Sequence, residues 1–402
     1  MTCACEVTPS PVRSWRSTIA TPLLHVLFFV AAAAVTVIVP LLAQLRLAYD
    51  LSPSSVALLL AAPGLATLVG SLPAGMLGDR FGARRVTILA TLMLSASSLA
   101  QALPTYAAVV TGRFAFGLAF GTVWTTGVAW MAQSQSRGGS SSLGAISTSA
   151  AVGIIIGPAL GGVVGQRFGL AAPFLLTAAV SAALSVALCA VDEPARATRA
   201  RRKPAIREAI RLVRREANGL CSAIGLLIVG IVAGVTQLLV PLQLHDAGLT
   251  AAGTGIVFAI GAGAYIVVSA MVVRLGSDAI TPRVSAVACL LLAVSLLPAT
   301  FDVGAVAVVG ALVLSAAGRG AVNTISYPLG AVSEASQHEG EGVVMGILNS
   351  GWAVGFVLAP LLAGWVDELA GPGPAYLIAV IPGTFGAIVM LRSARRRTPA
   401  DR

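Results

Sequence analysis

Three side chains that can hold a charge or a proton stand inside long apolar stretches of this 402-residue sequence: Arg113, Arg319 and His25. An arginine in such surroundings is costly, so it usually faces protein or a water-filled cavity. Arg319 could bind an anionic group of a ligand there, or it could pair with backbone carbonyls. His25 could exchange a proton near neutral pH, although a lone histidine in an apolar stretch is more often a packing residue. These residues suggest ion binding and proton exchange.

Arg319 belongs to a polar face, because Asn323 and Tyr327 follow it at intervals of four residues and therefore lie on the same side of a helix. Turning this face to lipid would be expensive, so we expect it to line a polar cavity or a contact between helices. Other side chains could supply stacking and polar contacts, with structural packing as the alternative for each: Trp124, Trp130, Gln237, Asn349 and Trp352.

No arrangement typical of an enzyme accompanies these residues. The sequence has no Walker loop, so ATP hydrolysis is not the expected energy source. Cys3 and Cys5 form a C-x-C pair with no histidine nearby, which is weak support for a metal site. We expect no catalytic residues, no metal and no bound cofactor.

The elements that position these side chains are membrane-spanning helices. Hydrophobic residues make up 57% of the chain and the mean hydropathy is +0.90, far above an ordinary soluble domain. Apolar stretches of about 18–25 residues, long enough to cross a bilayer, recur throughout. The sequence predicts an all-α membrane protein with twelve spans, near residues 19–43, 53–76, 86–104, 106–131, 143–165, 171–191, 219–242, 252–273, 283–300, 303–327, 342–365 and 372–391.

The basic residues set the expected orientation. With both termini inside, 22 of the 26 Lys and Arg residues fall in cytoplasmic segments and two fall in outer loops, as the positive-inside rule requires. This pattern accounts for the net charge of +10 without a nucleic-acid partner. We therefore expect a multi-pass protein of the cell membrane with both termini cytoplasmic.

The basic middle segment divides the chain into a six-helix half (1–192), a cytoplasmic linker (193–217) and a second six-helix half (218–402). Ile206, Ile210, Val213 and Ala217 predict one apolar face of an amphipathic helix on the inner membrane surface. The halves also repeat: 151–169 aligns with 353–371 at an offset of 202 residues, with matched glycines and with Pro158 opposite Pro360. Two similar halves are typical of secondary transporters, which bind their substrate between them.

The stretch "GMLGDRFGARR" (75–85) resembles the loop signature between helices 2 and 3 of the major facilitator superfamily. Its glycines predict close helix packing and a tight turn at Gly82, and Asp79 is expected to cap the following helix. In that family the acidic and basic residues of this loop form a conformational latch on the cytoplasmic side. The resemblance assigns that role to Gly75, Asp79, Arg80, Gly82, Arg84 and Arg85.

Two further patterns resemble the same family. "GRFAFGLAFG" (112–121) is similar to its fourth-helix motif, whose arginine is linked to proton coupling; for Arg113 the alternative is a side chain that reaches the membrane surface. "GIIIGPALGG" (153–162) matches the fifth-helix motif of the drug/proton antiporters at Gly153, Gly157, Pro158, Gly161 and Gly162. The glycines spaced four apart also predict one smooth ridge for helix packing.

The resemblance implies the major facilitator fold and proton-coupled efflux of small drug-like or metabolite substrates by alternating access, with the proton gradient as energy source. However, no carboxylate lies in the middle of an expected span, unlike in many exporters of cationic drugs. Protons would then be handled by Asp50, Asp79, Glu334 or His25, or the substrates are neutral or anionic, or coupling is weak.

The alternative function is a proton-coupled importer of a sugar, an organic anion or another metabolite; a membrane sensor that does not transport is a further, weaker alternative. The expected partners are a small-molecule substrate, protons and the lipid bilayer, and we expect the chain to function as a monomer.

Overall fold

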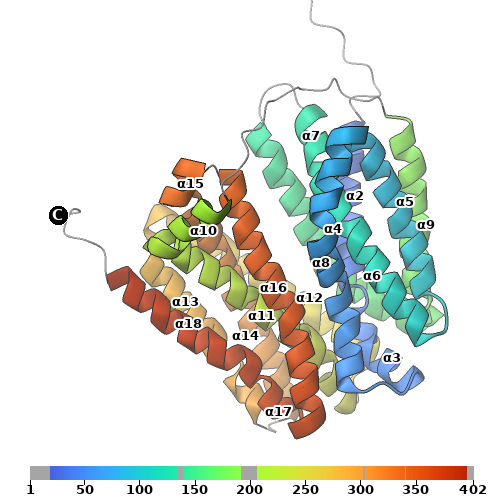
Figure 1. Ribbon diagram of the computed structural model, residues 1–402. Coiled ribbons are helices and arrows are strands. Elements are labelled where there is room, and N and C mark those ends of the chain that lie inside the picture. The colour runs from blue at the N-terminus through green and yellow to red at the C-terminus, as the bar shows by residue number, and fades with distance from the viewer. Residues whose placement is uncertain (1–18, 135–138, 192–205, 302–303, 340, 396–402) are drawn as a thin grey trace, which may run out of the picture.

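The structure is a computed structural model that describes residues 19–134, 139–191, 206–301, 304–339 and 341–395. Throughout these residues the chain is helical and is joined by short turns, with no strand. The helices form two groups, which meet at the end that carries α3 and α17 and lie farther apart at the end that carries α7 and α10 (Figure 1). We call these the α3 end and the α10 end.

The N-terminal half consists of helices up to Cys189. They are α2 (Ala20–Thr36), the 3-10 turn η1 (Val39–Leu41), α3 (Leu42–Ala48), α4 (Pro53–Phe81), α5 (Ala83–Gln101), α6 (Tyr106–Thr122), the π-helical turn η2 (Val123–Gly127), α7 (Val128–Ser134), α8 (Gly139–Phe168) and α9 (Ala172–Cys189).

The C-terminal half begins after the basic linker. It contains α10 (Ile206–Arg215), α11 (Ala217–Asp246), α12 (Ala251–Leu275), η3 (Gly276–Ala279), α13 (Pro282–Val294), η4 (Leu297–Thr300), α14 (Gly304–Ala331), α15 (Glu334–Glu339), α16 (Glu341–Ala370), α17 (Pro372–Ala375) and α18 (Leu377–Arg395).

Eleven helices in the described part of the chain are long and apolar enough to cross a membrane, so the expected count of twelve is not confirmed. The helix that falls short is α5, the third expected span. Its polar residues, including Thr87, Ser95 and Gln101, are buried. Thr87 Oγ1 lies 2.8 Å from Thr126 Oγ1, and Ser95 donates to the carbonyl of Ala178 at 2.8 Å. The polarity of α5 is therefore turned toward its neighbours in the bundle.

The repeat predicted from the sequence is visible in the helices themselves. α8 and α16 each contain 30 residues, begin and end 202 residues apart, and carry Pro158 and Pro360 at the same internal position. Each ends before a glycine with positive φ, Gly169 at 91° and Gly371 at 85°, a conformation that side chains disfavour.

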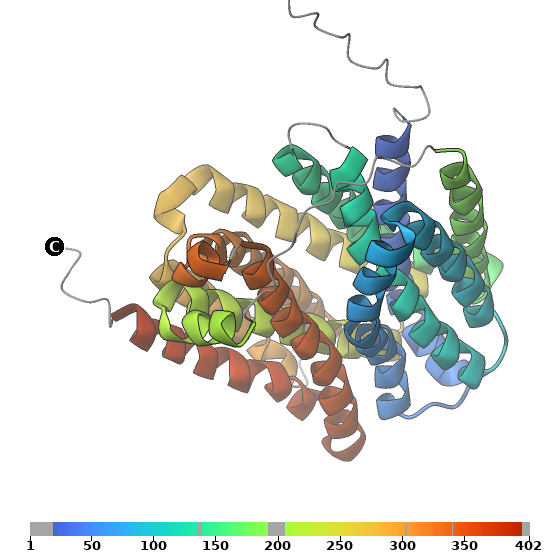
Figure 2. The same ribbon diagram turned by 45° about the horizontal axis from the view of Figure 1, so that its top comes forward.

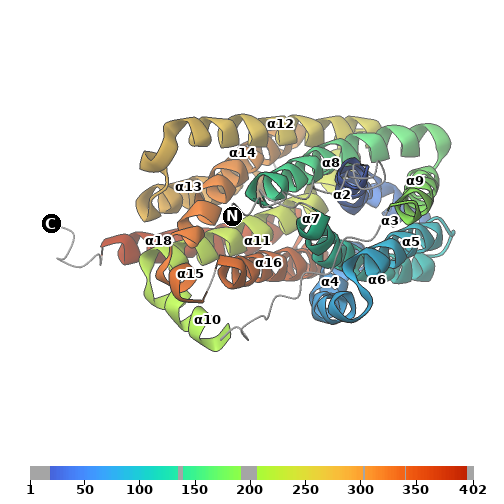
Figure 3. The same ribbon diagram turned by 90° about the horizontal axis from the view of Figure 1, so that it is seen from above.

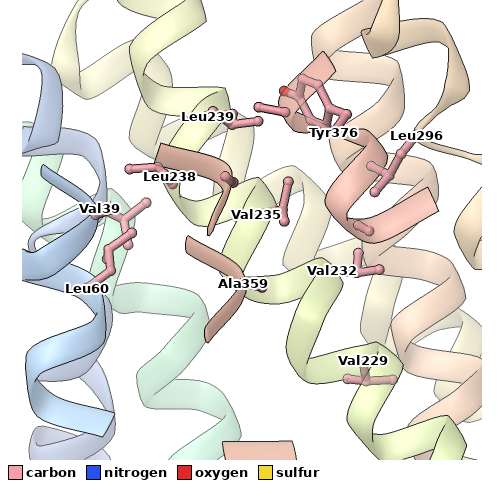
Figure 4. Close-up of a cluster of buried hydrophobic side chains, with 14 of the residues drawn as sticks. Val39, Leu60, Val229, Val232, Val235, Leu238, Leu239, Leu296, Ala359 and Tyr376 are labelled. Carbon is pink, nitrogen blue, oxygen red and sulfur yellow. The ribbon is translucent and has the colours of Figure 1, made fainter. Parts of the chain in front are cut away.

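The two halves touch along two helix pairs, α4 with α16 and α8 with α12; Figures 2 and 3 show these helices side by side from other directions. The largest apolar cluster spans both halves. In Figure 4, Val39 and Leu60 of the N-terminal half lie close to Leu238 of α11, which belongs to the same cluster. Burial of these side chains holds the halves together in this conformation.

One local prediction was wrong. Asp79 does not cap the following helix, because α4 continues through Phe81 and Gly82, at φ 95°, is the N-cap of α5 without a side-chain hydrogen bond. The helix expected in the basic linker is present as α10. Val213 packs against Leu226 of α11 and Ile210 is exposed, and the position of this helix on the inner membrane surface stays a prediction. The linker residues 193–205 lie outside the described part of the chain.

Candidate functional site

A cavity of about 190 Å³ lies between the two halves. α2, η1 and α8 line it from the N-terminal half, and α11, α12, α14 and α16 line it from the C-terminal half. Most of its lining residues are apolar. The side chains with a polar atom are Thr36, Gln237, Tyr265, Arg319, Asn323 and Trp352.

Arg319 and Asn323 reach the cavity from one face of α14, as the spacing predicted. Asn323 Nδ2 donates a hydrogen bond to Tyr265 Oη of α12 at 2.9 Å. Gly320 allows this approach, since a Cβ there would stand 2.5 Å from the carbonyl oxygen of Tyr265. Arg319 Nε is buried and has no hydrogen-bond partner in the described structure. The face therefore presents a cation to the cavity beside a Tyr–Asn pair.

Residues of α11 and α16 add an amide and an aromatic surface to the cavity. The side-chain carbonyl oxygen of Gln237, on α11, is buried without a partner among the described residues. Trp352 stacks on Phe356 with ring centroids 5.0 Å apart and an interplanar angle of 10°. The cavity thus combines unpaired polar atoms with flat apolar walls, which is typical of sites for small organic molecules.

Three of the other predicted cavity residues lie elsewhere. Tyr327 Oη donates to Asn349 Oδ1 at 2.7 Å, which joins α14 to α16 outside the cavity lining. Trp124 packs edge-on against Phe28, with ring centroids 5.0 Å apart, inside the N-terminal half. The structure therefore brings Gln237, Arg319, Asn323 and Trp352 together and leaves these three aside.

Arg113 is held by backbone carbonyls. Its Nε donates to Leu59 of α4 at 2.9 Å and its Nη2 donates to Val35 of α2 at 3.4 Å. Its guanidinium also lies 5.4 Å from the ring centroid of Phe116. Only 1% of Arg113 is exposed, so it does not reach the surface of the bundle and the alternative of a surface-seeking side chain is wrong. It connects α6 to two neighbouring helices.

The glycine-rich segment of α8 packs on two partners. A Cβ at Gly153, Gly157 or Gly161 would collide with a backbone carbonyl of α2 or of the turn after it. On another face, a Cβ at Gly162 would collide with the carbonyl of Ala251, the first residue of α12 in the opposite half. The predicted ridge is present, and the same segment also closes the contact between the halves at the α3 end.

Comparison with known proteins identifies the architecture. The sequence model of the Major Facilitator Superfamily matches residues 24–333. The chain belongs to the major facilitator superfamily. It is therefore a multi-pass membrane transporter and not an enzyme. It is 30% identical over 155 residues to Multidrug resistance protein 2 of Bacillus subtilis (strain 168), a match that covers 38% of each chain.

Solved structures of superfamily transporters share the fold. A bacterial homologue of the human lysosomal transporter Spinster, in an inward-facing and occupied conformation, aligns over 97% of this chain and 100% of that one with a TM-score of 0.79 and 14% identity. A D-xylose–proton symporter aligns over 94% and 98% with a TM-score of 0.72 and 16% identity. A point mutant of the nucleoside transporter NupG aligns over 93% and 99% with a TM-score of 0.71 and 13% identity.

The segment that resembles the superfamily's loop signature lies at the α10 end. Arg84 Nη2 donates to the carbonyl of Cys189, the last residue of α9, at 2.8 Å. Arg80 stands 5.1 Å from the ring centroid of its neighbour Phe81, and Asp79 and Arg85 are exposed. Gly75 approaches Thr125, with 3.7 Å between its Cβ position and Thr125 Cγ2. The segment is thus anchored to α9 while its carboxylate remains at the surface.

Of the three remaining proton candidates of this transporter, Glu334 is exposed at the start of α15, and the other two lie apart from each other. His25 Nδ1 is 3.1 Å from Ser149 Oγ, which links α2 to α8. Asp50 is exposed in the turn between α3 and α4, where it adopts a φ of 50°. Neither belongs to the cavity lining.

Tyr265, Thr36 and Phe258 line the cavity but were missed from the sequence. Tyr265 carried a usable signal, because it is the only tyrosine of the expected span 252–273. A tyrosine in such a span needs a partner for its hydroxyl. Thr36 carried no such signal. Its hydroxyl donates to a carbonyl of its own helix, as helical threonines commonly do, and also to the carbonyl of Ile154 in α8, a contact that the sequence does not reveal.

Proposed function

We propose that this transporter exports small drug-like or metabolite molecules by alternating access, driven by the proton gradient. The observation that carries alternating access is the position of the cavity: residues of both repeated halves line it, and the halves are in contact at the α3 end. Rocking the halves about the cavity would close the α10 end and open the α3 end.

Two observations favour export over import. The glycine-proline segment of α8 carries the complete antiporter pattern, and Multidrug resistance protein 2 is similar over part of the chain. Import remains the second candidate function, because transporters for a nucleoside and for D-xylose share the fold. On the distribution of the basic residues, we propose a cell-membrane protein of three segments (1–192, 193–217, 218–402) with both termini cytoplasmic. We also propose that the chain functions as a monomer.

Proton drive rests on the resemblance and on a small set of titratable residues. Among the described residues that line the cavity there is no carboxylate, so proton uptake would occur outside it. His25 is one of these candidates, and its partner Ser149 belongs to α8, the helix that packs on both α2 and α12.

The test is a panel of toxic compounds in a host that lacks its own exporters, with and without a protonophore. We expect resistance to at least one compound, and loss of that resistance when the gradient is collapsed. Transport in inverted vesicles gives the direction: acid-interior vesicles should accumulate an exported compound. Resistance that survives the protonophore contradicts proton drive, and accumulation only in right-side-out vesicles favours the importer.

A further inference from the structure

The charge balance of the cavity points to a class of substrate. Among the cavity residues that the structure describes, Arg319 is the only one with a charged side chain. Its Nε is buried without a hydrogen-bond partner. A guanidinium keeps its charge under all physiological conditions, so the cavity presents a cation with no counter-charge in its lining.

Arg113 shows how an arginine pairs with backbone carbonyls in the same protein, although its Nη1 is buried without a hydrogen-bond partner among the described residues. Its Nε and Nη2 both donate to backbone carbonyls of neighbouring helices. Such pairing was the alternative considered for Arg319, and Arg319 Nε does not have it. An unpaired cation that is partly withdrawn from water costs free energy, which an anion or hydrogen-bond acceptors can offset. Because Arg319 borders an open cavity, a ligand can supply that anion.

The groups beside Arg319 favour an organic anion. Tyr265 accepts a hydrogen bond from Asn323, so its own hydroxyl hydrogen is free to be donated to an acceptor. The side-chain oxygens of Asn323 and Gln237 are buried without partners and can accept from a hydroxyl or an amide of the ligand. The remaining walls are apolar, including Ile155, Phe258 and the ring of Trp352. An inorganic anion would leave these walls unused.

We infer that the cavity binds amphiphilic organic anions: molecules with one carboxylate, sulfonate or phosphate held by Arg319 and Tyr265, and an apolar or aromatic body against Phe258 and Trp352. The inference rests on the proposed function only in treating this cavity as the substrate site. A planar carboxylate suits the fork of a guanidinium, which can donate two parallel hydrogen bonds to it. Cationic compounds are disfavoured, since they would meet Arg319 with no carboxylate nearby.

The test measures binding to the purified full chain in phosphatidylcholine nanodiscs. The probes share one fluorophore and differ in charge: dansylglycine (anion), its methyl ester (neutral) and dansyl-ethylenediamine (cation). We expect dansylglycine to bind at least about ten-fold more tightly than either of the others. Arg319→Gln should remove this preference, Arg319→Lys should restore part of it, and Arg274→Gln, which removes an exposed arginine of α12, should leave it unchanged.

Binding of the ester or the amine as tight as that of the acid overturns the inference, as does the absence of dansylglycine binding or an unchanged preference in a folded Arg319→Gln protein. Thermal unfolding of each variant separates loss of binding from loss of fold. Nanodiscs that contain phosphatidylglycerol identify the source of the anion. If the headgroup of phosphatidylglycerol is the ligand, this lipid should compete with dansylglycine and weaken its binding to the wild type. The residual binding of dansylglycine to Arg319→Gln should not change.

This assay needs neither a gradient nor transport, so the two proposals fail separately. Charge-selective binding without protonophore-sensitive resistance would overturn proton-driven export and leave the anion site standing. Proton-driven export without a preference for the acid would overturn the anion site and leave proton-driven export standing.

Discussion

Gln166 and Glu368 lie 202 residues apart and each contacts the N-terminal turn of a helix in the opposite half. Gln166 Oε1 accepts a hydrogen bond from the backbone N–H of Ala252 in α12 at 3.1 Å. Glu368 Oε2 accepts one from Ser54 Oγ in α4 at 2.6 Å. The same pseudo-symmetry that relates α8 to α16 therefore relates the two contacts that close the α3 end.

The first prediction concerns Gly364 of α16, which is buried where α16 packs on α4. A Cβ at this position would stand 2.8 Å from Ala57 Cβ and 2.9 Å from the carbonyl oxygen of Pro53. Overpacking of this kind costs about 1–3 kcal/mol, so Gly364→Leu should shift the population away from the conformation closed at the α3 end by about five- to 150-fold. Spin labels at Gln166→Cys and Ala252→Cys, in a background without the native cysteines, should report longer distances.

The matched control is Gly310→Leu on α14, because a Cβ at Gly310 meets nothing within 4 Å. It should leave the distance distribution as in the wild type. Identical distributions for both leucine variants would show that the halves do not approach at Gly364 as the structure indicates.

Features of the fold that depend on glycines and prolines could be predicted from the sequence. The repeat, the glycine ridge of α8 and the turn at Gly82 follow from residues that a backbone contact or a positive φ requires, and such requirements leave a local pattern. The pattern of α12 is different, since this helix is apolar on every side and periodicity does not show which face turns toward α14. The position of Tyr265 is set by that tertiary packing, and so its pairing with Asn323 was not foreseen.

The cap prediction failed for a related reason. Asp79 precedes a helix in the sequence, but whether it caps that helix depends on where α4 ends, and packing of Gly78 against Thr126 accompanies continuation of α4 to Phe81. Ala209 is buried although the expected apolar face of this helix did not include it, because α10 contacts α11 and α15, which a helical wheel does not show.

Asp79→Asn should reduce transport at least about ten-fold and leave the melting temperature unchanged. A ten-fold change corresponds to a free-energy difference of about 1.4 kcal/mol. In this conformation the carboxylate is exposed at the α10 end, so we expect its removal to leave the packing of the described residues unchanged. A latch role requires partners that it meets when the halves close at that end. Transport in proteoliposomes and thermal unfolding measure the two effects. Glu208→Gln, which removes another accessible carboxylate that pairs with Arg211 at 2.8 Å, is the control and should transport normally.

Arg113, which is buried, and Arg319, which is partly buried beside the cavity, should respond oppositely to the same substitution. Arg113→Gln removes hydrogen bonds to Leu59 and Val35 and leaves these carbonyls without that donor, which costs about 1–3 kcal/mol and should lower the melting temperature by several degrees. Arg319→Gln removes an unpaired cation and should leave the melting temperature unchanged or raise it. Thermal unfolding in nanodiscs without ligand tests both. A lower melting temperature for Arg319→Gln than for Arg113→Gln would mean that Arg319 has a structural partner.

Tyr265→Phe tests whether the hydroxyl next to Arg319 takes part in binding the anion. The substitution keeps the ring and removes the donor, while Asn323 loses its acceptor and stays beside the cavity. A hydrogen bond to a charged group contributes about 1.5–3 kcal/mol, so dansylglycine should bind about ten- to 150-fold more weakly and its methyl ester should bind as before. Tyr376→Phe makes the same chemical change outside the cavity, where Tyr376 Oη donates to Gln243 Oε1 at 2.6 Å, and should affect neither probe. Equal weakening of acid and ester by Tyr265→Phe would mean that the hydroxyl shapes the cavity without contacting the anion, because only a direct contact distinguishes the two probes.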